Sequence, residues 1–161
     1  MQSRSKVIAI GVAIAFGLFV AALAFGVSIA RLGNLPSGPP PPTTEHVEVI
    51  VNGMVSVAAN SYESRQFAVP VDAVRPIVRG NFFVDSAQVA TIHVMILNSE
   101  SFANWQSNKT ISVNYYSSTQ VTTAELEAGV PKGQTLYLIF DNTYDAKAKS
   151  VKADIELAYL R

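Results

Sequence analysis

The chain of 161 residues contains no cysteine. This absence excludes disulfide frameworks, zinc–thiolate sites, blue copper, covalent c-type haem and thiol nucleophiles together. Charged residues are also scarce, because they make up 15% of the sequence whereas a typical soluble domain has roughly 25%. Hydrophobic residues, in contrast, reach 49%.

Acidic residues are absent from the first 44 positions, since all 12 of them lie at Glu45 or beyond. Three of the 12 basic residues precede Glu45, so the net charge of zero combines a positive N-terminal part with an acidic remainder. The acidic part has no cluster of Lys and Arg. We therefore expect no nucleic acid among the partners.

A long uncharged run, Val7–Ala30, lies between Lys6 and Arg31. As a helix, these 24 residues would extend about 36 Å, enough to cross a hydrocarbon core of about 30 Å. A cleavable signal peptide is the alternative, with Ser28-Ile29-Ala30 as its cleavage site, but its apolar region is usually about 7–15 residues long. We predict a transmembrane signal anchor over residues 7–30.

The basic residues beside this run predict its orientation. Arg4, Lys6 and the amino terminus outweigh Arg31, and the more positive flank of a span stays in the cytoplasm. Residues 1–6 are therefore expected in the cytoplasm and everything after the anchor on the extracytoplasmic side. The predicted location is the cell membrane, with a single pass through the lipid bilayer.

Small residues occupy every fourth position in part of the predicted span, at Ala9, Ala13, Gly17 and Ala21. This spacing places them along one side of a helix, where the backbone of another helix can approach closely. The alternative is that Ala and Gly are simply common in membrane spans. Specific helix packing along this stripe is one hypothesis, and plain anchoring is the other.

Residues 31–45 form a proline-rich extracytoplasmic linker with four consecutive prolines, Pro39–Pro42. Such a run favours polyproline II, which acts as a semi-rigid spacer. We expect it to hold a globular ectodomain, residues 46–161, away from the bilayer.

Short segments in which polar and apolar residues alternate dominate from His46 onward, and such alternation is typical of half-buried strands. Asn52-Gly53 separates the first two segments and predicts a hairpin turn, since both central residues of that turn need positive φ. The segments are His46–Val51, Met54–Ala58, Arg65–Val69, Ile77–Val84, Val89–Leu97, Ile111–Tyr116, Val121–Leu126, Thr135–Phe140 and Val151–Leu160.

This pattern predicts an all-β fold, namely a jelly-roll-like antiparallel β-sandwich of about eight strands preceded by the single transmembrane helix. Leu136–Phe140 is apolar on both faces and is expected in the centre of a sheet. Gly80 falls inside a strand segment and indicates either a strand end or a bulge. Ser99–Gln106 fits either one helical turn or a long loop.

The segment Gly133–Tyr144, followed by Lys149-Ser150-Val151 and a last amphipathic strand, resembles the end of a GOLD domain. This domain is the luminal β-sandwich of a family of secretory-pathway cargo receptors, so the resemblance implies a β-sandwich over residues 46–161. In that family the span follows the domain, with an intervening coiled coil and usually two cysteines. Here the predicted span comes first and cysteine is absent, so the resemblance extends to the fold and not to a cargo-receptor role.

Residues able to carry chemistry are few. His46 and Glu48 share one face of a strand, but a metal site needs three or four converging ligands. His93 lies in the middle of a strand segment. The sequence contains neither a nucleophile elbow nor a phosphate-binding P-loop. We therefore expect no catalytic residues, no cofactor and no enzymatic activity.

Asp141, Asn142 and Asp145 place several oxygen-bearing side chains in one loop and are weak candidates for a calcium site. Calcium takes about six to eight oxygen ligands, more than this loop offers. The alternative is that Asp and Asn stabilise the turn by bonding to their own backbone. The small number of local ligands favours the turn.

Two further features concern the surface. Asn108-Lys109-Thr110 is an N-glycosylation sequon on the predicted outward side, which makes Asn108 a candidate acceptor. Aromatic residues expected to be partly exposed are available for an interface or for stacking on sugar rings, although Trp105 fits a role in covering the core equally well. These aromatics are Phe102, Trp105, Tyr115, Tyr116 and Tyr144.

The features together favour a non-catalytic, single-span accessory or scaffolding subunit of a larger membrane protein complex. Its ectodomain would then make protein–protein contacts with integral membrane subunits. An extracytoplasmic module that binds glycans or another ligand is the alternative. A pilin-like filament subunit is third, because Ser5-Lys6-Val7 offers no processing junction and the span contains no acid.

Overall fold

The computed structural model describes residues 44–85 and 90–161 of the chain. The predicted cytoplasmic segment 1–6, the signal anchor 7–30 with its stripe of small residues, and the linker up to residue 43 lie outside these ranges. Within the described ranges, no helix is long and apolar enough to cross a membrane.

Eight strands and one short helix make up the described part. The strands are β1 (Glu45–Val57), β2 (Ser61–Ala68), β3 (Val74–Val84), β4 (Ile92–Asn98), β5 (Asn114–Val121), β6 (Thr123–Gly129), β7 (Thr135–Asn142) and β8 (Lys149–Leu160), and the helix is α2 (Ser99–Gln106).

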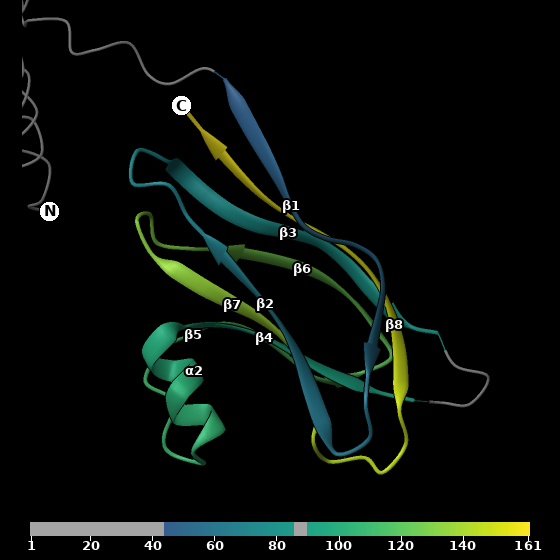
Figure 1. The fold of residues 1–161 in the computed structure, drawn as a ribbon. Coiled ribbons are helices and arrows are strands. Elements are labelled where there is room, and N and C mark those ends of the chain that lie inside the picture. The colour runs from purple at the N-terminus through teal and green to yellow at the C-terminus, as the bar shows by residue number, and fades with distance from the viewer. Residues whose placement is uncertain (1–43, 86–89) are drawn as a thin grey trace, which may run out of the picture. The chain divides into compact units, whose positions relative to one another are not determined.

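The strands form two four-stranded sheets, in the orders β1-β8-β3-β6 and β2-β7-β4-β5. All strand pairs are antiparallel. The chain crosses between the sheets at most of its connections, so that β1 and β8 lie side by side although they are far apart in the sequence (Figure 1). The prediction of an antiparallel β-sandwich with about eight strands is confirmed.

The core lies between the two sheets, and the alternation of β8 builds one side of it. Its inward side chains are at most 4% exposed, whereas Lys152 and Asp154 between them point to solvent. The inward residues are Val151, Ala153, Ile155, Leu157 and Tyr159, and they belong to one cluster with Leu138 and Phe140 of the other sheet. The predicted two-faced pattern of β8 is therefore confirmed.

The predicted hairpin at Asn52-Gly53 is wrong, because both residues lie within the 13-residue strand β1. Gly53 has a φ of 130° but remains paired with Ala153 of β8. The alternation runs in phase through this point, so that Val51 and Val55 on either side both face the core. Continuous pairing with β8 therefore replaces the local turn that the dipeptide favours.

Gly80 marks neither a strand end nor a bulge. It pairs in register with Ile155 of β8 and Leu126 of β6. A Cβ at this position would lie 2.0 Å from the carbonyl oxygen of Asp154. The glycine is therefore needed for the close approach of two backbones, at a φ of 148°.

Ser99–Gln106 forms the helix α2, which resolves the alternatives of turn and loop. The side chain of Asn98 caps it, since Oδ1 accepts a hydrogen bond of 2.8 Å from the backbone N–H of Ser101. The next segment is tied to the helix because Val113 N–H donates to Ser101 Oγ at 3.0 Å. The strand β5 begins at Asn114, three residues later than predicted.

Candidate functional site

The two sheets differ in what lies on their outer faces. On the β2-β7-β4-β5 sheet, α2 packs against β4 and β7, and Figure 1 shows it beside β4 and β5, away from β1, β3 and β8. Met95, Leu97 and Ile139 are buried beneath it. This second layer explains why β7 is apolar on both faces, as predicted. The prediction that β7 is central is also confirmed, since it lies between β2 and β4.

The outer face of the β1-β8-β3-β6 sheet, here called the open face, has no element packed over it among the described residues. Its side chains come from alternate positions of all four strands, and the strand register sets them in rows. One row is Val49, Glu156, Arg79 and Glu127, the next is Asn52, Asp154, Asn81 and Glu125, and a third is Met54, Lys152, Phe83 and Thr123.

Large apolar side chains are exposed at one edge and one corner of the open face. Val47 is 46% exposed, Val49 66% and Met54 52%, all on β1. Phe83 on β3 is 41% exposed, with the ammonium group of Lys152 5.9 Å from its ring centroid. Several exposed apolar side chains on one uncovered face are typical of a contact surface.

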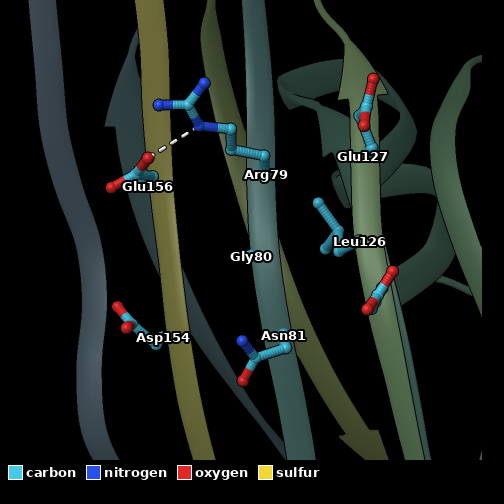
Figure 2. A pocket seen from close by; sticks show the side chains of 8 residues that line it. Arg79, Gly80, Asn81, Leu126, Glu127, Asp154 and Glu156 are labelled. Carbon is cyan, nitrogen blue, oxygen red and sulfur yellow. Dashed lines mark hydrogen bonds and ion pairs between the residues drawn. The ribbon is translucent and has the colours of Figure 1, made fainter.

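The centre of the open face is acidic. Arg79 Nε donates to Glu156 Oε1 at 2.8 Å (Figure 2). Its Nη1 donates to Glu45 Oε1 at 3.1 Å. The hydrogen bond to Glu156, with further contributions from Glu45, raises the pKa of Arg79 above its ordinary value. Among the described residues, Glu125 and Glu127 on β6 form no ion pair. The one arginine is therefore neutralised within the face, and two carboxylates stay available.

A shallow depression of about 390 Å³ lies in this acidic region. Its rim carries side chains from β8, β3 and β6, and Figure 2 shows Arg79 turned toward Glu156 while Glu127 stands apart on β6. The lining residues are Arg79, Gly80, Asn81, Glu125, Leu126, Glu127, Asp154 and Glu156.

A second polar cluster lies on the other sheet, on the three neighbouring strands β7, β4 and β5. His93 Nε2 lies 2.7 Å from Ser117 Oγ, and His93 Nδ1 lies 3.5 Å from Asp141 Oδ2. The other oxygen of Asp141 accepts the N–H of Thr143 at 2.9 Å. Burial by itself would raise the pKa of Asp141, but the hydrogen bonds from His93 and Thr143 outweigh burial and lower it.

Sequence patterns do not reveal this cluster. Ser117 lies 24 positions from His93, and Asp141 is a further strand away, so no contiguous motif contains two of them. Ser117 faces the histidine because β5 carries a bulge between the pairs His93–Gln120 and Met95–Ser117. Such a bulge re-aims side chains and has no clear signal in a single sequence.

The three weak calcium candidates have separate partners. Asp141 faces His93, and Asp145 Oδ2 lies 3.2 Å from Nζ of the buried Lys149. Asn142 is fully buried and donates to the carbonyl groups of Ala58 and Lys147, each at 2.9 Å. In residues 44–85 and 90–161, no group of three or more His, Asp or Glu is arranged to hold a metal ion.

The predicted pair His46 and Glu48 also has a different partner. The ring of His46 stacks on Tyr159 with centroids 5.5 Å apart, and Glu48 Oε1 accepts a hydrogen bond from the Tyr159 hydroxyl. Both side chains therefore serve the pairing of β1 with β8.

The five predicted surface aromatics are packed against the rest of the domain to different extents. Phe102 of α2 packs against Tyr62 and Tyr137, and Trp105 packs against Tyr62 and Phe102, with centroid distances between 4.5 and 6.1 Å. The role of Trp105 in covering the core is therefore the one the structure shows.

The three tyrosines of this group direct their hydroxyl groups to neighbouring loops and strands. Tyr115 donates to Gln134, Tyr116 to the carbonyl of Glu125 and Tyr144 to the carbonyl of Thr91, over distances from 2.8 to 3.3 Å. Burial raises the pKa of Tyr116. Tyr144 is the most open of the three at 39%. The sequon residue Asn108 is exposed two residues after the end of α2, so it is accessible.

No protein-family model and no curated protein matches the chain. A solved structure described as "Bacillus endospore appendages form a novel family of disulfide-linked pili" is similar over 79% of this chain and 97% of that chain, with 11% identity and a TM-score of 0.43. A likeness of this degree carries no argument about function. The GOLD-like resemblance of the C-terminal third stays a prediction.

Proposed function

We propose that the chain is a membrane-anchored accessory or scaffolding subunit of a larger membrane protein complex, with the open face as its contact surface. The observation that carries this proposal is the contrast between the two sheets, since α2 covers one outer face and the other presents apolar and acidic side chains together. Surfaces that bind other proteins present exposed apolar side chains beside polar and charged ones, and the open face has both kinds.

The charge of the open face indicates the chemistry of the partner. Arg79 is already paired with two carboxylates, so Glu125, Glu127 and Asp154 leave the face acidic. A partner surface with Lys or Arg beside apolar side chains would complement it. An extracytoplasmic loop or domain of an integral membrane subunit fits this description, given the predicted anchor at residues 7–30.

The test compares two exposed valines. Val49 lies on the open face at 66% exposure and Val71 in the β2–β3 loop at 76%, so Lys at either site leaves the core intact. After gentle detergent extraction, Val49→Lys should recover about tenfold less partner than the unchanged chain, equivalent to about 1.4 kcal/mol. Val71→Lys should recover the usual amount.

If both variants recover the same amount of partner, the open face is not the contact surface. A second pair separates the face from the span, because Gly17→Ile should weaken association more than Leu18→Ile if the small-residue stripe packs on a partner helix. Recovery of the unchanged chain as a lone monomer would count against an accessory subunit altogether.

A glycan is the second candidate ligand of the same face. Asn52, Asp154, Asn81 and Glu125 form one cross-strand row of planar amide and carboxylate groups, with exposed Phe83 in the next row. Such groups donate and accept hydrogen bonds with sugar hydroxyls, and an aromatic ring can stack on a sugar. Retention on a glycan array that Asn81→Ala abolishes would favour this candidate over a protein partner.

A further inference from the structure

Ser117, His93 and Asp141 are connected in the same order as the nucleophile, the base and the orienting acid of a catalytic triad. Exposure rises along the cluster, from the Asp141 side chain at 8% to the His93 side chain at 24% and then to the exposed Ser117. Catalytic triads on unrelated folds combine the same three groups, namely a buried acid, an imidazole and a hydroxyl group that substrate can reach.

The hydrogen positions follow from the acceptor chemistry of Asp141. An ionised carboxylate can only accept, so the imidazole nitrogen facing it, Nδ1, carries the hydrogen. Nε2 of the neutral ring is then an acceptor, and Ser117 must donate its hydroxyl hydrogen to it over 2.7 Å. The N–H of Thr143 fixes the carboxylate from its other side. The serine is therefore held in the arrangement that a general base requires.

We propose that Ser117 is a nucleophile toward unhindered carboxylic esters, with His93 as its general base and Asp141 as a positioning residue. The hydroxyl stands exposed on β5, which is an edge strand, so an ester can reach it from solvent. The backbone N–H groups along the free edge of β5 are the donors that this proposal assigns to the developing oxyanion. The inference is independent of the contact surface on the other sheet.

The reaction balances with water as the second substrate. Ser117 Oγ bonds to the carbonyl carbon while its proton passes to His93 Nε2, and the same proton goes to the leaving alcohol as its C–O bond breaks. Water then attacks the acyl-serine, gives one proton to His93, and the acid leaves as Ser117 recovers that proton. The imidazolium formed in each half is stabilised by Asp141 at 3.5 Å, a separation that such pairs often show before substrate binds.

The first test uses a fluorophosphonate probe on the full-length protein, with intact mass and peptide mapping as readout. One adduct is expected on Ser117, formed with loss of fluoride. His93→Gln should slow labelling about 100-fold or more, and Asp141→Asn should slow it while leaving the site unchanged. The control Ser56→Ala, an exposed serine on β1, should label as the unchanged chain does.

A second variant keeps the proposal testable if the His93 substitution disturbs folding. The chain has no cysteine, so Ser117→Cys introduces a single thiol beside His93, and a thiol next to such a base is deprotonated more readily than a free one. At neutral pH it should react with iodoacetamide at least about tenfold faster than the thiol of Ser56→Cys. Equal alkylation rates, or the lack of a fluorophosphonate adduct on Ser117, would overturn the proposal and leave the cluster as a structural polar network.

Discussion

The hydroxyl of Tyr159 on β8 donates a hydrogen bond of 2.6 Å to Glu48 on β1, 111 positions away in the sequence. The same ring stacks on His46 and lies under the guanidinium of Arg161, which in turn pairs with Asp72. These contacts connect β1, β8 and the β2–β3 loop at one end of the sandwich. They help to hold the largely exposed first half of β1 against β8.

The Tyr159 contact predicts a change of stability in alkali. The hydrogen bond to Glu48 raises the pKa of Tyr159 above its ordinary value of 10.0. A group whose pKa is raised by folding stabilises the fold fully below its unfolded pKa, and this contribution is lost as the pH rises through the folded pKa. The difference in melting temperature between the unchanged chain and Tyr159→Phe should therefore shrink from about pH 9 to about pH 12.

Glu48→Gln is the matched control, since it keeps an acceptor and removes the charge. In this variant the pKa of Tyr159, followed by ultraviolet absorbance, should move back toward its ordinary value. A melting-temperature difference that is constant over the whole range would contradict the prediction.

Alanine substitutions at three glycines distinguish the cost of backbone strain from the cost of steric overlap. At Gly129 an added Cβ meets open space and φ is ordinary, at Gly53 the space is open but φ is 130°, and at Gly80 φ is 148° and a Cβ would overlap Asp154. Substitution by Ala should cost least at Gly129, about 1–3 kcal/mol at Gly53, and about 3 kcal/mol or more at Gly80. Denaturant unfolding measures the order, and a Gly53→Ala variant as stable as Gly129→Ala would refute the strain argument.

Two phenylalanines test the difference between the covered and the open face. Phe102 stacks on Tyr137 at 4.5 Å under α2, whereas Phe83 is 41% exposed on the open face. Phe102→Ala should lower the free energy of unfolding by about 1–3 kcal/mol, below the value for a fully buried ring. Phe83→Ala should change it by about 0.5 kcal/mol or less. A larger loss at Phe83 than at Phe102 would mean that the open face is covered in the native protein.

The lowered pKa of Asp141 predicts that part of the stability of the fold is lost in acid. Its pKa is lowered in the folded chain, because the hydrogen bonds from His93 and Thr143 outweigh the raising effect of burial. A depressed carboxyl pKa contributes stability above the unfolded pKa, and this contribution is lost as the pH falls through the folded value. The stability gap between the unchanged chain and Asp141→Asn should thus be full at neutral pH and narrow below about pH 4. Acid titrations of both proteins by circular dichroism measure this gap, and a gap that widens in acid would contradict the assignment.

Local patterns are sufficient to predict β8 and the buried character of β7. The alternation in β8 corresponds to burial directly, because a strand's side chains point to opposite faces with a period of two, and the apolar run in β7 corresponds to a strand covered on both faces. The β-sandwich class follows from several such segments in a chain of this length. At Gly80 the sequence predicted a strand end or a bulge, and both were wrong, because the reason for the glycine, the carbonyl oxygen of Asp154, belongs to a strand 74 positions away.

The sequence by itself determined the class of the fold, the phase of its strands and the asymmetric distribution of charge, because these depend on side-chain period and composition alone. Only the tertiary structure decided that Asn52-Gly53 continues a strand, that α2 covers one sheet and leaves the other open, and that Ser117, His93 and Asp141 meet. Each of these depends on which distant strand supplies the partner backbone. Pairing along twelve residues of β8 outweighs the preference of a dipeptide for a turn, and that choice of partner is not encoded within a local window.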